Sequence, residues 1–179
     1  KFLARLIKEI ENNGLLHVLR RGIVDIGIYF KLAYFKPVSG LNESLIERYN
    51  CNVLSVVRQL KYSVKNENSL DMVLMLNGIP LISMELKNQF TGQTVADAVK
   101  QFMFNRDPSE LIFQHNKRTL IHFAIDTDEV YMTTQLQGDK TVFLPFNSGN
   151  NGGSGNAKVD KGYRTSYLWE NVLEKDSII

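Results

Sequence analysis

Two acidic residues and a lysine in the middle of the chain have the types and spacing of a metal-dependent hydrolytic site. Asp71 precedes an Asn77-Gly78 pair, and Glu85 and Lys87 follow it. Carboxylate oxygens suit Mg²⁺, and a bound cation can activate water and stabilise charge on a phosphorus centre. A neighbouring lysine can orient that water. These residues are compatible with a Mg²⁺-dependent phosphodiester-cleavage site in which Asp71 and Glu85 would hold the cation and Lys87 would orient the attacking water or neutralise developing charge.

The elements that must position these groups are the two strands of a β-hairpin. Short apolar runs flank Asn77-Gly78, which is the strongest local hairpin pattern. Glu85 and Lys87 are two residues apart, so they face the same side of an extended strand. A plain two-residue turn would set Asp71 across from Met84, on the wrong face. We predict a bulge with Gly78 in the left-handed conformation, or an equivalent offset, that sets Asp71 across from Glu85.

The acid-x-Lys pattern alone does not distinguish catalysis from a structural ion pair at a strand edge. One such match is expected by chance in a chain with 19 acidic residues. Burying the two charges would cost several kcal/mol per ion unless they are paired or bind a metal. The surrounding sequence is therefore needed to distinguish a catalytic site from a structural ion pair.

The rest of the chain predicts an α/β fold with a central mixed sheet flanked by helices. Apolar spacing from Phe2 predicts an opening helix that stops at Asn12-Asn13-Gly14, and Asn42 can cap a helix over 43–50. Residues 15–40 are interpreted as irregular or short-strand structure. Strands are expected near 52–63, 118–125, 130–134 and 141–146, a helix after Gly92 with Asp97, Gln101 and Asn105 on one face, a short helix near 108–114, a closing helix over 163–173, and a flexible loop over 149–155.

Amino-acid composition excludes some classes of protein but does not identify a binding partner. The 179 residues are 44% hydrophobic and 22% charged, which is typical of a globular domain and excludes a disordered, fibrous or membrane-spanning chain. A net charge of +2 neither indicates nor excludes nucleic acid. A single cysteine, Cys51, and the lack of a signal-peptide pattern favour a cytoplasmic setting.

Many short segments resemble one family. The Asp71, Glu85-Leu86-Lys87 pattern resembles the PD-(D/E)xK nuclease core, although Leu70 stands where that family often has proline. Over almost the whole chain the sequence is similar to the N-terminal nuclease domain of type I restriction enzyme R (restriction) subunits. The segments that carry this resemblance are Asn68-Ser69-Leu70-Asp71, Asn77-Gly78-Ile79-Pro80, Glu85-Leu86-Lys87-Asn88, Thr91-Gly92-Gln93, Arg106-Asp107-Pro108, His122-Phe123-Ala124, Met132-Thr133-Thr134, Phe143-Leu144-Pro145-Phe146-Asn147 and Tyr163-Arg164-Thr165-Ser166-Tyr167-Leu168-Trp169-Glu170.

The resemblance implies a site and its cofactor. Residues 1–179 would form one restriction-endonuclease-like domain in which Asp71, Glu85 and the Leu86 backbone carbonyl bind Mg²⁺. Lys87 would be catalytic and Gln101 would support the site, although Asn105 stands where many such nucleases have a tyrosine. An additional acidic residue on the first helix is common in the superfamily, and Glu9 or Glu11 could serve.

The resemblance also implies partners. The substrate would be double-stranded DNA, and the partners would be the methylase and specificity subunits of a restriction complex. An ATP-driven motor would lie downstream, so that ATP is not bound by these residues and the chain is expected to be a fragment of a longer one. The basic residues that could border a DNA path are Lys61, Lys65, Lys100, Arg106, Lys117 and Arg118.

Two other functions remain open at this point. The first is a non-catalytic DNA-binding or subunit-docking module on the same fold, against which the retention of Asp71, Glu85 and Lys87 argues. The second is another nuclease of the superfamily, such as a repair or junction nuclease.

Overall fold

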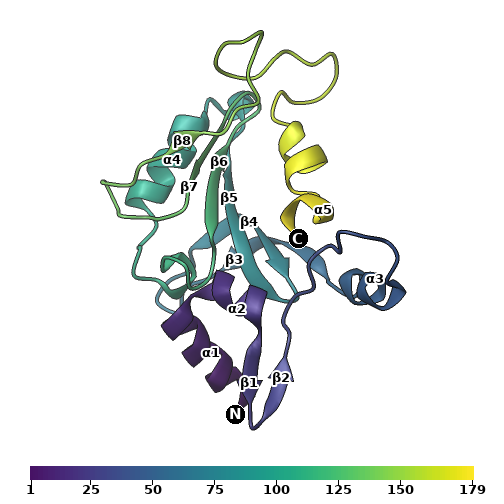
Figure 1. The fold of residues 1–179 in the computed structure, drawn as a ribbon. Helices are drawn as coiled ribbons and strands as arrows, with labels where there is room; N and C mark the ends of the chain where they lie inside the picture. Colours follow the sequence, from purple (N-terminus) through teal and green to yellow (C-terminus); the bar gives the residue numbers. More distant parts are fainter.

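The computed structural model describes residues 1–179 and is built around one six-stranded sheet (Figure 1). A separate two-stranded hairpin lies near the N-terminus. In chain order the helices and strands are α1 (Phe2–Asn13), α2 (Leu15–Arg21), β1 (Ile23–Asp25), β2 (Ile28–Phe30), α3 (Glu43–Asn50), β3 (Leu54–Lys61), β4 (Ser69–Leu76), β5 (Ile79–Leu86), α4 (Val95–Phe104), β6 (Ile121–Ile125), β7 (Val130–Thr133), β8 (Leu144–Pro145) and α5 (Lys175–Ile178). Short 3₁₀ turns cover Gln89–Thr91 and Leu111–Phe113, and a π-helical turn covers Leu168–Val172.

The sheet is mixed, and its strands lie in the order β3-β4-β5-β6-β7-β8. All neighbours are antiparallel except β5 and β6, which are parallel. A parallel pair needs a crossover connection, and α4 lies within it. The predicted α/β fold class, a central mixed sheet flanked by helices, is confirmed.

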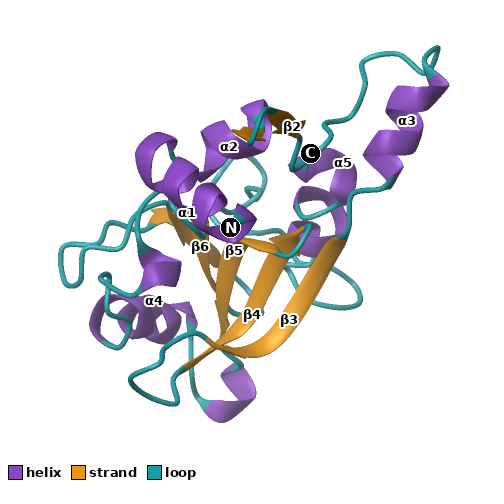
Figure 2. Ribbon diagram, turned by 90° about the horizontal axis from the view of Figure 1, so that it is seen from below, coloured by secondary structure: helices purple, strands orange, loops and turns teal.

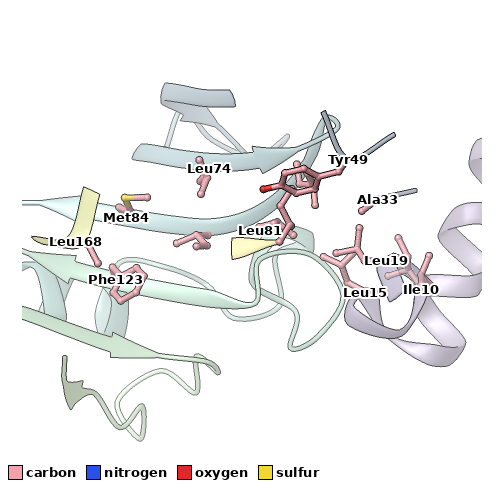
Figure 3. Close-up of a cluster of buried hydrophobic side chains, with 14 of the residues drawn as sticks. Ile10, Leu15, Leu19, Ala33, Tyr49, Leu74, Leu81, Met84, Phe123 and Leu168 are labelled. Atoms are coloured by element: carbon pink, nitrogen blue, oxygen red, sulfur yellow. The ribbon is translucent and has the colours of Figure 1, made fainter. Parts of the chain in front are cut away.

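Helices cover both faces of this sheet. Figures 1 and 2 show α4 on one side and α1, α2 and α5 on the other. The face shared by α1, α2 and the C-terminal segment buries 17 hydrophobic residues, which we call the large core. Leu74, Met84, Phe123 and Leu168 form its part nearest the C-terminal segment (Figure 3). The opposite face buries nine residues, including Ala98 and Phe102 of α4, and we call it the α4 core.

Most of the predicted elements are present. α1 ends before Gly14, which has a φ of 84°, and α3 begins after Asn42, whose side chain accepts a hydrogen bond from the backbone N–H of Leu45. The strands predicted near 52–63 and 118–125 are confirmed as β3 and β6, although each is shorter than expected. The helix predicted near 108–114 is only the 3₁₀ turn over Leu111–Phe113.

Two helices were not predicted. Residues 15–40, interpreted as irregular or strand, begin with α2, which buries Leu15, Val18 and Leu19 at helical spacing. Gly14 joins the two helices with a φ of 84°, which glycine adopts readily. A Cβ at this position would also lie 2.2 Å from the Asn116 side chain. The second helix, α5, is one turn long at the C-terminus.

The C-terminal part differs most from the prediction. The strand expected over 141–146 contains only the two residues of β8, and the helix expected over 163–173 is the π-helical turn. Hydrogen bonds from Tyr49 and Lys36 to Asp176 instead hold this segment to distant parts of the chain. These long-range contacts leave no periodic pattern in the sequence.

Candidate active site

The β4–β5 hairpin brings Asp71 and Glu85 together. Its turn is the two-residue Asn77-Gly78 connection, and both residues have positive φ (51° and 81°), as a type I′ turn requires. Leu76 pairs with Ile79 next to the turn, yet Met72 pairs with Met84. One extra residue, Leu81, therefore lies in β5 as a bulge.

The predicted offset is confirmed, but its position is not. The sequence suggested a bulge at Gly78, whereas the register shifts beyond Pro80, where Leu74 pairs with Ile82. The Leu81 carbonyl accepts a hydrogen bond from the Leu120 N–H at 2.7 Å, which ties the bulge to the start of β6. Continuing the shifted register sets Asp71 opposite Glu85, on the face covered by α4.

Glu85 is fully buried and held by two polar side chains. Arg106 donates from Nε (2.8 Å) and Nη2 (2.5 Å) to Glu85 Oε1, and Gln101 donates from Nε2 to Oε2 at 2.8 Å. Burial raises the pKa of Glu85 to about 7; Arg106 opposes this shift, and the Asp71 carboxylate adds to it. The carboxyl group is therefore poised between its charged and neutral forms near neutral pH.

Asp71 is fixed by one backbone group and one side chain. Its Oδ2 accepts a hydrogen bond from the Leu86 N–H at 2.8 Å, and its Oδ1 accepts one from Gln59 Nε2 at 3.0 Å. Gln59 also accepts a hydrogen bond from the Ser69 hydroxyl. Its φ of 49° lies in the left-handed region, which is strained for a non-glycine residue in a strand.

Lys87 extends toward α4. Its Nζ donates to Gln101 Oε1 at 2.5 Å, so the Gln101 amide joins Lys87 to Glu85. α4 presents Gln101 to the sheet from a fixed start, because Thr94 and Asp97 form a capping box and Asp126 accepts from the Val95 N–H at 2.8 Å. The predicted positions of Asp71, Glu85, Lys87 and Gln101 thus come together in one cluster.

The backbone N–H and carbonyl of Leu86 point toward β4. The Lys87 N–H donates to the Ile125 carbonyl of β6, and along a strand the backbone groups of successive residues point to alternate sides. The Leu86 N–H accordingly points to Asp71, and the Leu86 carbonyl shares its direction. The backbone oxygen expected to bind metal therefore lies on the side of the aspartate.

Arg106 is a site residue whose role the sequence did not indicate. It was expected among the basic residues bordering a DNA path, but it is 6% exposed and paired with Glu85. Its Nη2 also donates to the Ser69 carbonyl, and its guanidinium lies over the Tyr62 ring. The clue available in the sequence was the glutamate itself, because a buried carboxylate requires a cation or a proton.

Other expected contributors lie elsewhere. Asn105, in the position of the family tyrosine, is exposed at the end of α4. Glu9 pairs with Arg5, and Glu11 pairs with Lys117, which precedes the start of β6. Because β5 and β6 are parallel, that end of the sheet is opposite to the end that carries Glu85. Neither glutamate joins the cluster.

The side chains of the cluster can supply part of a coordination shell. No group of three His, Cys, Asp or Glu side chains is close enough to hold a metal ion. Asp71 and Glu85 nevertheless provide two carboxylates and Leu86 a carbonyl, which are the hard oxygen donors that Mg²⁺ prefers. Mg²⁺ usually keeps several waters and takes further oxygens from a phosphate, so two side-chain ligands fit this ion.

Comparison with known proteins gives one match. A family model described as type I restriction enzyme R protein N terminus matches residues 34–141, a range that includes Asp71, Glu85, Lys87 and Gln101. No curated protein and no solved structure matches the chain. The mixed sheet flanked by helices is consistent with a restriction-endonuclease-like core. None of the helices is long and apolar enough to span a membrane.

Proposed function

The chain belongs to the family of type I restriction enzyme R protein N termini, and from this premise we propose that it is a Mg²⁺-dependent endonuclease domain that cleaves double-stranded DNA. The observation that carries the proposal is the cluster at the end of β5. Two carboxylates face each other across a hairpin, and a lysine of the same strand is joined to one of them through Gln101.

Asp71, Glu85 and the Leu86 carbonyl would hold the metal ion. When bound, Mg²⁺ lowers the pKa of a coordinated water and offsets negative charge on the phosphate. The donor set favours a small, hard cation. Burial raises the pKa of Glu85 to about 7, and a cation beside its carboxylate would favour the ionised form of this group.

The protein residues have distinct parts in the hydrolysis. Water loses a proton to the solvent as it attacks the phosphorus atom, the bond from phosphorus to the leaving oxygen breaks, and that oxygen takes a proton from the solvent to depart as a hydroxyl group. The Lys87 ammonium can orient the water or donate a hydrogen bond to a phosphate oxygen, while Gln101 fixes its position. Arg106 holds Glu85 in one orientation and takes no direct part, because its guanidinium is buried beneath the site.

The partners follow from the family. A type I restriction enzyme domain acts in a complex with other subunits and DNA. We propose that these are the methylase and specificity subunits, together with an ATP-driven motor that delivers DNA to the site. The net charge of +2 suits such a domain, since its DNA would be held by other parts of the complex.

Plasmid nicking tests the proposal. The protein assembled with its partner subunits, ATP and Mg²⁺ is compared with Asp71→Ala and Lys87→Ala variants. We expect cleavage to fall by about a hundredfold or more in both, while ATP hydrolysis continues, because each change removes a group from the chemical step alone. Lys8→Ala is the matched control, since Lys8 is an exposed lysine of α1, which covers the other face of the sheet (Figure 2).

The alternative function makes the opposite prediction. A non-catalytic DNA-binding or docking module would not nick plasmid DNA with any divalent cation. Cleavage at the wild-type rate in both Asp71→Ala and Lys87→Ala would show that the proposed site is wrong.

A further inference from the structure

An apolar groove lies on the other face of the sheet from Glu85, beside the same strand end. It has a volume of about 530 Å³ and runs between β3, β4 and β5 and the C-terminal segment. Its floor is formed by large-core side chains, among them Met72, Leu74 and Met84. The proposed chemistry uses none of these residues.

Two aromatic side chains stand at the rim of the groove. Tyr163 is 49% exposed and Trp169 is 47% exposed, although both rings border an apolar surface. Their ring centroids are 6.3 Å apart and the rings are nearly perpendicular, with an interplanar angle of 74°. Because each ring is about half exposed, each keeps a surface on which another planar group can stack.

The groove and the candidate active site share the end of β5. Leu86 lines the groove with its side chain, and its N–H donates to Asp71. Lys87 and Asn88 also border the groove. A strand of DNA with a phosphate at the carboxylates would reach the groove by passing around the end of β5.

Positive charge lies next to the aromatic rim. A second hollow of about 460 Å³ continues from the groove through Asn88 and Tyr163, and Lys158 and Arg164 line it. Arg164 is paired with Asp128 at 3.3 Å, the Lys87 ammonium is bonded to Gln101 on the α4 face, and Asp126 lines the groove, so Lys158 is the cation of the rim that has no ion-pair partner. Aromatic rings on which a base can stack, with a basic side chain beside them for the backbone, are features of sites that bind unpaired nucleotides.

We propose that this groove holds an unstacked nucleobase of the DNA strand whose phosphate lies at the Asp71–Glu85 site, an inference that rests on the proposed nuclease function. The base would stack on Trp169 or Tyr163 and be enclosed by the apolar floor. The site would thereby prefer strands with unpaired bases, because a paired base would first have to leave its helix.

Trp169 makes the proposal directly measurable, because it is the only tryptophan in the chain. The probes are a short oligothymidylate and a blunt duplex of the same length, with Ca²⁺ in place of Mg²⁺ to limit cleavage. We expect oligothymidylate to quench Trp169 emission. Trp169→Leu should bind oligothymidylate roughly fivefold to a hundredfold more weakly, which is the range measured for losing one base stack.

Two further variants control for folding. Trp169→Phe keeps an aromatic ring and should retain most of the affinity. Tyr163→Leu tests the second ring without changing the reporter. Duplex affinity, measured by anisotropy of a labelled strand, should change little in all three variants, because phosphate contacts dominate it.

The outcomes separate the two proposals. Unchanged Trp169 emission at saturating oligothymidylate, or wild-type affinity in Trp169→Leu, would overturn the base-binding site while leaving plasmid nicking intact. An apolar dye that binds the groove and is not displaced by oligothymidylate would also overturn it and indicate a protein partner. Quenching by oligothymidylate in a protein that never nicks DNA would instead support the groove and refute the nuclease.

Discussion

The two faces of the central sheet bury different kinds of groups. The large core consists of hydrophobic side chains from helices and strands far apart in the sequence. The α4 face has a smaller apolar core, and beside it lies the Glu85–Arg106 pair, the one ion pair of the chain with both side chains buried. Stability is concentrated on one face and chemistry on the other, because a buried charge weakens a core unless it is fully paired.

Breaking the buried ion pair should have the largest effect on stability. We expect Arg106→Ala to lower the free energy of unfolding by about 3–5 kcal/mol, because Glu85 would be left buried without its cation. Urea unfolding followed by circular dichroism measures this change. In a Glu85→Gln background the cost of the same Arg106→Ala change should be much smaller, since no carboxylate then remains to be neutralised.

The matched control lies on the other face. Met84 precedes Glu85 but packs into the large core, and Met84→Ala should cost about 2–5 kcal/mol through the cavity that it leaves. Its cost should be nearly the same with Glu85 or Gln at position 85. Equal costs of the Arg106 changes in both backgrounds would contradict the assignment of a buried charge pair.

Stability should depend on pH through two opposing groups of the α4 face. Burial raises the pKa of Glu85 from 4.5 to about 7, so the folded state keeps a proton that the unfolded chain loses, and stability falls as pH rises through this window. Burial lowers the pKa of His122 from 6.5 to about 4, so stability falls as pH drops through that window. The two slopes nearly cancel where the windows overlap.

Glu85→Gln removes one of these slopes. Its free energy of unfolding should then rise by about 1–3 kcal/mol from the lower to the upper end of the overlapping window, while that of the wild type stays nearly constant. Urea midpoints measured across this pH range test the difference. A variant profile as flat as the wild-type profile would show that Glu85 does not hold the extra proton.

Gln59 should give the smallest change in stability. Gln59→Gly loses the hydrogen bond to Asp71 but relieves the left-handed backbone, and each effect is worth about 1 kcal/mol, so the net change should be close to zero. Gln59→Ala loses the hydrogen bond and keeps the strain, so it should be less stable than Gln59→Gly by about 1 kcal/mol.

Cleavage provides the second measurement on Gln59. Both variants should cut DNA about fivefold more slowly than the wild type, because Asp71 loses one of its two fixed contacts. Wild-type cleavage by Gln59→Gly would mean that the Leu86 N–H alone positions Asp71.

Local patterns predicted the hairpin well but not its surroundings. The Asn77-Gly78 turn and the alternation along β5 placed Glu85 and Lys87 on one face, and the even spacing from Asp71 required an extra residue somewhere in the hairpin. The position of that residue depends on the Leu120 contact with Leu81, which is a tertiary contact. No periodicity reveals such a contact.

The missed residues share the same cause. Arg106 and Gln59 act through side-chain contacts across elements, and their types are common on protein surfaces. α2 was missed because its single buried stripe is only two turns long. The expected helix over 163–173 has suitable apolar residues, but the contacts of Tyr49 and Lys36 with Asp176 help to set the course of this segment.

The strand order of the sheet also bears on how the molecule folds. β3 to β8 lie side by side in the order in which they occur along the chain, so each strand pairs with its predecessor, and only β6 must first cross over through α4. The C-terminal segment, in contrast, must return across more than a hundred residues to reach Lys36 and Tyr49. We expect this segment to dock last and to exchange its amide hydrogens first, which would open the groove wall while the paired carboxylates stay in register.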